Sequence, residues 1–256
     1  MEDVMQELQR GIDYSSSYYV IRADFAESHR RFWQRLASPG SWWTSAERIA
    51  IAEEVRAAWD CPLNQARREA LSPNAAPKEY SRVSDVLPDV AVEAIHRITT
   101  DANRLTKDRY LSLLERGLSE GQYIEIVGTI VSMVSIDSFC IAMGLPLNAL
   151  PEPGPGEPNR YRPSKAGPDD AWVPMVDADN SESAESDLWV ANQTGNVVRA
   201  MSLVPEEVRT LKDLSSAHYL AMPDVRKHGY NGGRALSRTQ MELVAGRTSA
   251  LNACYY

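Results

Sequence analysis

The chain has few cysteines, few histidines and no recognisable metal-binding spacing. Its 256 residues include three cysteines that lie far apart, which excludes a disulfide-stapled secreted scaffold. The four histidines stand singly, at His29, His96, His218 and His228. None of them has zinc-ligand spacing with a cysteine or a carboxylate, so we expect no metal and no other cofactor.

Signals for secretion and for membrane insertion are also missing. The longest apolar run, Tyr123–Ile136, is shorter than a bilayer span needs and contains Glu125, so it predicts a buried helix. The first residues, Met1–Glu7, are acidic and have no apolar core of a signal peptide. Together with the unpaired cysteines, these features predict a cytoplasmic protein with no membrane role.

Clustered basic charge is absent as well. The formal net charge is −8, the isoelectric point is near 5.1, and Lys and Arg are scattered singly. Nucleic-acid phosphates require clustered basic side chains, so we expect no nucleic-acid partner. Hydrophobic residues make up 43% of the chain, which is ample for a packed core.

Helix start signals are abundant. Capping boxes occur at Thr44–Glu47, Ser119–Gln122 and Ser237–Gln240, each before a run of good helix formers. The second box opens the long apolar helix, which should end near Met143 because a glycine and a proline follow.

Two shorter helices are predicted before the long one. Residues 88–104 form one, with Pro88 in its first turn, and residues 106–116 form another that Gly117 closes. Few segments show the period-two alternation of strands. The sequence therefore predicts an all-α fold.

The composition changes in the middle of the chain. Prolines are dense between Pro151 and Pro174, and acidic residues are dense over Asp169–Asp187. Such a stretch cannot continue a helix and is expected to bury little apolar surface. We therefore expect an N-terminal helical repeat over 1–150, a linker over 151–190, extended or wrapped over a neighbour, and a C-terminal helical repeat over 191–256.

The segments on either side of the linker are alike. The string YVIRADF at Tyr19–Phe25 matches NVVRAMS at Asn196–Ser202. Placing Cys61 on Cys254 also aligns the first capping box with the third. Three anchors in the same order predict an internal duplication whose halves superpose.

The end of the chain carries part of a redox motif. Glu242 precedes Cys254 by twelve positions, and the string SALNAC leads to that cysteine. This pattern resembles the alkylhydroperoxidase D and carboxymuconolactone decarboxylase family, in which a Glu is followed at this distance by Cys-x-x-Cys-x-x-x-His. The second cysteine and the histidine would fall beyond Tyr256. The resemblance extends to Trp43–Cys61 and Ile124–Gly128.

The resemblance implies a duplicated helical fold and the thiol-dependent reduction of organic hydroperoxides. Cys254 would be the nucleophile, Glu242 would relay protons, and the partners would be further copies of the chain and a dithiol reductant such as a lipoamide-bearing protein. Without a resolving thiol we expect this activity to be impaired. Alternatively, Glu242 is an ion-paired helix residue near Arg238 or Arg247.

Two other functions remain open at the level of sequence. One is decarboxylation of a small lactone acid, which the same family includes, although no carboxylate-binding arginine stands out. The other is a non-catalytic helical oligomer.

The remaining thiols and histidines have plain interpretations. Asn64 and Arg68 stand three and seven positions after Cys61, and neither can resolve a sulfenic acid. We therefore expect Cys61 and Cys140 to be core thiols. His96 is expected to be a helix histidine whose hydrogen bonds are satisfied.

Overall fold

The computed structural model describes residues 12–72, 80–177, 184–189 and 195–254, and over these residues the chain is mostly helical, as predicted. The α-helices are α2 (Ala23–Leu36), α3 (Ser45–Ala57), α4 (Pro62–Glu69), α5 (Asp89–Asp101), α6 (Lys107–Glu115), α7 (Glu120–Ala142), α8 (Asn196–Arg199), α9 (Pro205–His218), α10 (Met222–Val225) and α11 (Arg238–Leu251). Short elements are the 3-10 turns η1 (Ala102–Arg104) and η2 (Ser186–Leu188) and the strands β1 (Ala166–Gly167) and β2 (Met175–Val176). The acidic segment Met1–Glu7 lies outside the described residues.

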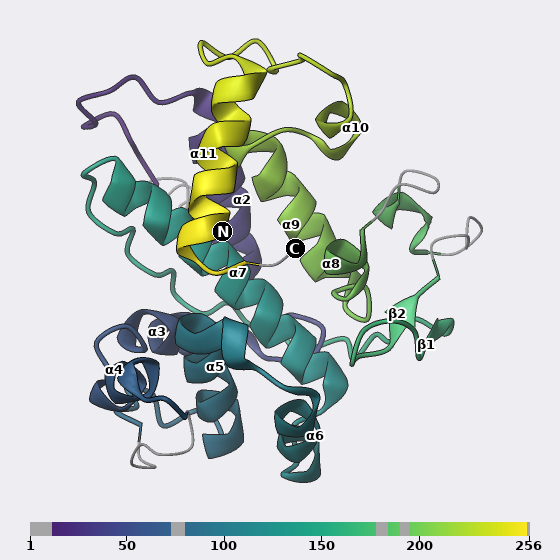
Figure 1. Cartoon of the computed structure of the whole chain (residues 1–256). Helices are drawn as coiled ribbons and strands as arrows, with labels where there is room; N and C mark the ends of the chain where they lie inside the picture. The colour runs from purple at the N-terminus through teal and green to yellow at the C-terminus, as the bar shows by residue number, and fades with distance from the viewer. Residues whose placement is uncertain (1–11, 73–79, 178–183, 190–194, 255–256) are drawn as a thin grey trace.

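Helix α7 is the centre of the fold. Its capping box is present, since the Gln122 amide donates to the Ser119 hydroxyl and the Gln122 side chain accepts from the Ser119 amide. Helices α3, α5 and α9 all pack against α7, which crosses the middle of the molecule in Figure 1. Its length and composition alone would let it cross a bilayer, but 61% of its apolar stretch is buried inside the protein. It is therefore apolar on nearly every side because other helices surround it.

The glycine stop signals lie where the sequence indicates them. Gly117 and Gly144 have φ angles of 100° and 67°, in the left-handed region that closes helices. The Leu145 amide donates to the Cys140 carbonyl at 2.8 Å across the second of these turns. The predicted ends of α6 and α7 are confirmed, and the helix expected over 88–104 is α5 followed by η1.

The described part of the predicted linker is extended and wraps over the connection between α2 and α3. The Gly154 amide donates to the Ala37 carbonyl, and the Arg160 amide donates to the Ser41 carbonyl, both at 2.8 Å. Strands β1 and β2 then pair in antiparallel fashion. This region buries more apolar surface than its composition suggests, because it contributes Val173, Met175, Val176, Leu188 and Trp189 to the buried core.

Helices α3 and α11 begin with the same kind of capping box but differ in their surroundings. In both, a hydroxyl accepts the amide three residues on, and that residue's side chain accepts in return. Helix α3 packs against α5 and α7 and buries most of its length. Among its described side chains, α11 buries Met241 alone. The predicted alignment thus pairs a core helix with a surface helix.

Candidate functional site

The structure places the two residues of the partial redox motif apart. Glu242 lies on α11, whereas Cys254 follows the end of that helix at Leu251 and is exposed. The helix between Glu242 and Leu251 alone spans about 13 Å at 1.5 Å per residue. Direct proton transfer requires hydrogen-bond contact, so these two residues do not form one site within this chain.

The Glu242 carboxylate is instead engaged by its neighbours. It accepts hydrogen bonds from the Tyr219 hydroxyl and from Nε of Arg238, the latter at 2.5 Å. The bond from Tyr219 and that from Arg238 hold the pKa of Glu242 below its ordinary value. This is the ion-paired arrangement that the sequence left open as an alternative.

Cys61 and Cys140 are both buried, as expected for core thiols. Cys61 occupies the cap position before α4, and Cys140 lies in the last third of α7. Burial raises the pKa of the Cys140 thiol, which disfavours the reactive thiolate.

A buried polar network surrounds His96. The Asn64 side-chain nitrogen lies 2.9 Å from Nδ1 of His96, and Nε2 of His96 lies 3.0 Å from Oε2 of Glu54. The other oxygen of Glu54 accepts from the amides of Val83 and Ser84, at 2.9 Å each. Both ring nitrogens are satisfied, which confirms the prediction for His96, and the network joins the segment before α5 to α3.

The fold also brings together two histidines that stand singly in the sequence. His29 of α2 and His218 of α9 face each other with their Nε2 atoms 2.6 Å apart. The Tyr14 hydroxyl lies 2.5 Å from Nδ1 of His29 and 3.8 Å from the Cys140 sulfur, and the Ser135 hydroxyl lies 2.9 Å from Nδ1 of His218. A continuous chain of hydrogen-bonding groups therefore crosses the core from Cys140 to Ser135.

Burial keeps this histidine pair neutral. It lowers the pKa of His29 to about 3 and that of His218 to about 4. Two neutral rings can share one proton between facing nitrogens, with one ring as donor and the other as acceptor. No group of three or more His, Cys, Asp or Glu side chains in the described part of the chain could hold a metal ion.

The strongest candidate site is a buried group of three charged side chains, here called the Arg48 cluster. Arg48 of α3, Glu125 of α7 and Glu207 of α9 meet where these helices pack and are 5%, 0% and 2% exposed. Nε of Arg48 lies 3.4 Å from Oε1 of Glu125, and Nη2 lies 3.6 Å from Oε1 of Glu207. Two carboxylates and one guanidinium would together carry a buried net charge of −1. If one carboxyl group retains a proton, the cluster is neutral.

Burial favours the protonated form of both carboxyl groups in the cluster. Burial raises the pKa of Glu207 to about 8, although the Arg48 charge opposes this. Burial raises the pKa of Glu125 as well, against the Arg48 charge and the Trp42 amide, which donates to Oε2 at 2.6 Å. A carboxylic acid beside a carboxylate and a guanidinium is typical of acid–base sites.

The backbone is shaped around the two carboxylates. A Cβ atom at Gly40 would lie 1.7 Å from Oε1 of Glu125, and one at Gly128 would lie 2.1 Å from Oε2 of Glu207. Oε1 of Glu125 faces Nε of Arg48 in the 3.4 Å ion pair, whereas Oε2 of Glu207 has no hydrogen-bond partner among the described residues. Buried polar atoms are rarely unpaired in folded proteins, so the unpaired oxygen of Glu207 makes this cluster a candidate site.

A pocket of about 380 Å³ opens onto the Arg48 cluster between α2, α3 and α9. Arg48 and Glu207 form part of its wall. Arg31 and Arg35 also line it, and both form ion pairs with Asp213, at 2.7 and 3.2 Å. The volume is within the range of small-molecule sites, and the charged side chains of the wall are three arginines and two glutamates, Glu206 and Glu207.

One sequence signal points to this site, although the same signal also argues against a membrane span. Glu125 interrupts an apolar run, and a carboxylate in a buried helix requires a partner. Arg48 and Glu207 carry no such signal, because each stands in a helix with many other charged residues. Comparison of the chain with protein-family models, curated proteins and solved structures found no match. The function is therefore argued from the geometry of the site.

Proposed function

We propose that this chain is an acid–base enzyme that acts on a small organic acid at the Arg48 cluster. The observation that carries the proposal is the pair of buried glutamates on Arg48, with Arg48 and Glu207 in the wall of the 380 Å³ pocket. At neutral pH Glu207 holds a proton, and Arg48 and Glu125 offset each other's charge. The site therefore offers an acid inside a region largely shielded from water.

The arginines of the pocket favour a substrate with a carboxylate. Planar guanidinium groups bind carboxylates through paired hydrogen bonds, and Arg31, Arg35 and Arg48 line one pocket. Asp213 offsets part of the charge of Arg31 and Arg35 but does not itself line the pocket. An anionic substrate would thus be held beside the Glu207 acid.

Among the reactions that need such an acid, the family resemblance favours decarboxylation of a small lactone acid. The bond from carbon to the carboxylate breaks, its electron pair stays on the carbon, carbon dioxide leaves, and Glu207 delivers its proton to that carbon. Water then returns a proton to Glu207, and no electrons are exchanged with a cofactor. The proposal agrees with the decarboxylase branch of the resemblance, because Trp43–Cys61 contains Arg48 and Ile124–Gly128 contains Glu125.

The test is proton transfer to substrate carbon in deuterated water. A panel of small lactone acids would be incubated with the protein, and nuclear magnetic resonance would follow carbon dioxide loss and deuterium incorporation. We expect Glu207→Gln to abolish both. Glu206→Gln is the matched control, because Glu206 lines the same pocket but stands outside the cluster. Activity should fall as the pH rises through about 8, where Glu207 loses its proton.

Two results would contradict the proposal. One is full activity in the Glu207→Gln variant, which would remove the acid from the mechanism. The other is no turnover of any acid together with no binding of carboxylates to the pocket, which would favour the non-catalytic helical oligomer.

A second function, thiol-dependent reduction of hydroperoxides, is favoured by the exposure of Cys254. Its thiolate would attack the peroxide, break the oxygen–oxygen bond and become a sulfenic acid while an alcohol leaves. Two thiol groups of an external dithiol would then restore it, forming a disulfide and water. We also propose the internal duplication of the chain, which the same family resemblance implies.

We expect the turnover of an organic hydroperoxide with dihydrolipoamide to be low, because Cys61 and Cys140 are buried and cannot reach a sulfenic acid on the exposed Cys254. Cys254→Ser should remove what turnover there is, and Cys61→Ser should leave it unchanged because Cys61 is buried. If turnover is fast and each of the two substitutions alone abolishes it, Cys254 and Cys61 act in one site.

A further inference from the structure

The loop between α2 and α3 contacts Glu125 through its backbone. The Trp42 amide donates to Oε2 of Glu125 at 2.6 Å. Burial raises the pKa of Glu125, and the Arg48 charge opposes that rise. The amides of Trp42, Ser41 and Trp43 oppose it as well. Three successive amides that interact with one carboxylate form a small anion-binding site, here called the amide nest.

Glu207 has different surroundings from Glu125. Burial raises its pKa, the Arg48 charge opposes this, and the charge of Glu125 adds to the rise. Of the other charged groups that face Glu207, Glu206 of α9 also raises this pKa and Arg35 of α2 lowers it. Its Oε2 atom has no hydrogen-bond partner among the described residues. Glu125 is therefore the better placed of the two to carry the negative charge.

The amide nest is seated on the first turns of α7. Nε1 of Trp43 donates to the Gln122 carbonyl at 3.1 Å. The ring of Trp42 lies against Gly121 so closely that a Cβ atom at Gly121 would overlap it. The loop is thus packed onto the same helix that carries Glu125.

Arg160 lies in the extended segment that wraps over this loop. Its amide donates to the Ser41 carbonyl at 2.8 Å, and its Nη1 atom donates to the Trp42 carbonyl at 3.0 Å. Its guanidinium also lies over the Trp42 ring, 5.9 Å from the ring centroid. Arg160 therefore holds two successive carbonyls of the loop.

Planar peptide groups connect these carbonyls to the amide nest. In a trans peptide the C=O of one residue and the N–H of the next lie in one plane and point in opposite directions. The Ser41 carbonyl shares its peptide group with the Trp42 amide, and the Trp42 carbonyl shares its group with the Trp43 amide. Because Arg160 binds the two carbonyls on one side, the two amides are directed toward Glu125 on the other.

Arg160 adopts an unfavourable backbone conformation in this position. Its φ angle is 56°, in the left-handed region that favours glycine. The side chain of Asn159, which lines the pocket of the Arg48 cluster, accepts from the Tyr161 amide at 2.8 Å and supports the turn. Glycine would adopt this angle freely, so the arginine is explained by the contacts of its side chain.

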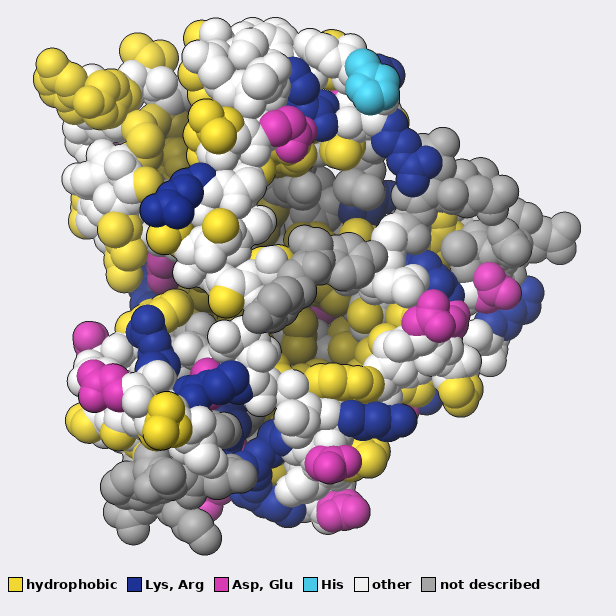
Figure 2. Space-filling view, viewed as in Figure 1, with side chains coloured by type: hydrophobic (Ala, Val, Ile, Leu, Met, Phe, Trp, Pro, Cys, Tyr) yellow, Lys and Arg dark blue, Asp and Glu magenta, His cyan; other side chains and the backbone are white. Residues whose placement is uncertain are grey.

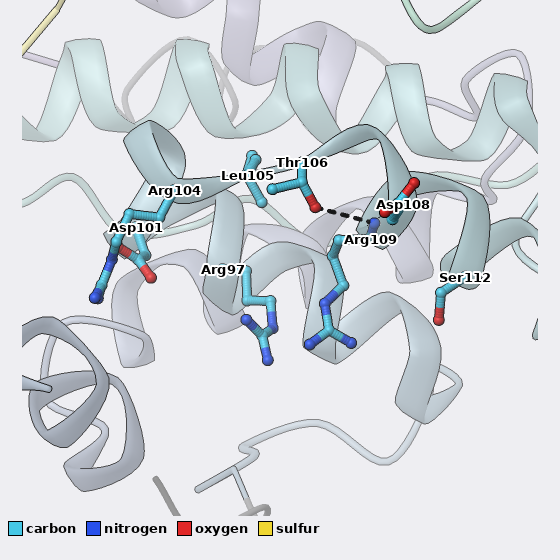
Figure 3. Close-up of a pocket in the computed structure, with 8 residues that line it drawn as sticks. All are labelled: Arg97, Asp101, Arg104, Leu105, Thr106, Asp108, Arg109 and Ser112. Atoms are coloured by element: carbon cyan, nitrogen blue, oxygen red, sulfur yellow. Dashed lines mark hydrogen bonds and ion pairs between the residues drawn. The ribbon is translucent and has the colours of Figure 1, made fainter. Parts of the chain in front are cut away.

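Side-chain ion pairs account for the arginines of a second pocket, of about 340 Å³, between the end of α5, the turn η1 and the start of α6 (Figure 3). Arg97 and Arg109 both pair with Glu93 at 3.2 Å, and Arg104 pairs with Asp101 at 2.6 Å. These pairs tie neighbouring elements together. The carboxylate of the Arg48 cluster differs from them because backbone amides hold it in addition to an arginine.

We propose that Arg160 is a positioning residue for the Arg48 cluster. By fixing the amide nest it keeps Glu125 charged and leaves the proton of the cluster on Glu207. The inference rests on the proposed function, in which Glu207 supplies that proton. Arg160 itself does not line the pocket, so it acts through the loop and not on the substrate.

The test is the titration of both carboxyl groups by nuclear magnetic resonance, in the full chain labelled with carbon-13 at the glutamate side-chain carboxyls. Through-bond correlation to the backbone assigns each resonance. In the unmodified chain we expect Glu125 to be charged at pH 7 and Glu207 to be protonated. Arg160→Gly keeps the backbone angle and removes the side-chain contacts. It should raise the titration midpoint of Glu125 by about half a pH unit or more, which is about threefold in acidity.

Arg162→Gly is the matched control, because it removes the same charge two residues further on. Arg162 pairs with Glu120 at 2.9 Å. This variant should move the Glu125 midpoint by less than about 0.2 pH unit, because the charge that it removes is exposed to solvent. Urea unfolding would establish that both variants are folded. If a glycine variant does not fold, Arg160→Met and Arg162→Met give the same comparison with the length of the side chain retained.

A shift of the Glu125 midpoint in the Arg160 variant alone supports the inference. Equal shifts in the two variants would overturn it, because they would reflect only the loss of positive charge. The absence of any shift would overturn it too, as would a protonated Glu125 beside a charged Glu207 in the unmodified chain.

The titration needs no substrate, so it separates this inference from the proposed function. Turnover that Glu207→Gln abolishes, without a shift of Glu125 in the Arg160 variant, would retain the enzyme and remove the role of Arg160. A shift in that variant without turnover of any acid would retain the role of Arg160 in setting the charge of Glu125 and remove the enzymatic function.

Discussion

At the scale of single residues, two helical glycines differ in the space that surrounds them. Gly128 faces Glu207 so closely that a Cβ atom would lie 2.1 Å from Oε2, whereas a Cβ atom at Gly246 of α11 would meet nothing within 4 Å. Both glycines lie inside helices. They form a matched pair for substitution.

We expect Gly128→Ala to lower the free energy of unfolding by about 1–3 kcal/mol, because the packed core cannot accept the added methyl group. Gly246→Ala should leave it unchanged or raise it by up to about 1 kcal/mol, since alanine is the better helix former. Urea unfolding at pH 7 would measure both. A Gly128→Ala variant as stable as the unmodified chain would show that Glu207 is not held against α7.

The buried histidine pair predicts a stability that depends on pH. The pKa values of His29 and His218 are lowered to about 3 and 4, whereas an unfolded histidine has a pKa of about 6.5. Below pH 6.5 the unfolded chain therefore binds protons that the folded chain does not. Stability should fall as the pH falls, by about 3 kcal/mol per histidine between pH 7 and pH 4.

Urea unfolding at pH 7, 5.5 and 4 would test this for the unmodified chain and for a His29→Gln, His218→Gln double variant. We expect the double variant to lose most of this pH dependence, although it should be less stable at pH 7. His228→Gln is the control, because His228 is exposed. An unchanged slope in the double variant would mean that other groups cause the acid sensitivity.

At the scale of elements, the same capping box opens one helix that is mostly buried and one that is mostly exposed. Thr44 and Ser237 both open their helices with a capping box. Helix α3 carries Arg48 into the core, whereas α11 exposes Leu243, Val244 and Leu251. Tertiary contacts, rather than the caps, therefore decide which helix contributes to global stability.

We expect Thr44→Ala to lower the free energy of global unfolding by about 1 kcal/mol, because α3 unfolds with the core. Ser237→Ala should leave the global midpoint unchanged and speed hydrogen exchange within α11, because that helix can open by itself. Urea unfolding and hydrogen exchange measured by mass spectrometry would separate the two. Equal shifts of the midpoint would show that α11 is part of the cooperative core.

At the scale of the whole molecule, the exposed apolar side chains of α11 favour self-association. Leu243, Val244 and Leu251 are 73%, 60% and 69% exposed, and Figure 2 shows hydrophobic side chains over this part of the surface. Several large apolar side chains exposed on one helix are typical of a surface that binds another protein. We propose that a second copy of the chain covers this face, in keeping with the oligomers that the family resemblance implies.

Light scattering at micromolar concentration should therefore give a mass that is a multiple of 28.5 kDa. The mass should not change with salt, because apolar contacts are not screened. Leu243→Glu should shift it toward the single chain, whereas Gln240→Glu, a change on the same helix at its capping box, should not. A mass of one chain for the unmodified protein would contradict the proposal.

Local signals in the sequence correctly predict where several helices begin or end. Capping boxes and glycine stops act over three or four residues, so α3, α6, α7 and α11 begin or end where their sequence indicates. The burial of Cys61 and Cys140 was also predicted correctly, because free cysteines are usually buried.

Which polar groups contact one another depends on how the helices pack. His29 and His218 are 189 residues apart, and the Arg48 cluster joins three helices from distant parts of the chain. The periodicity of the sequence does not predict such contacts. A charged residue that packing will bury cannot be told from an exposed one by its neighbours in the sequence. The separation of Glu242 from Cys254 likewise depends on α11 continuing as a helix to Leu251, which spacing alone does not show.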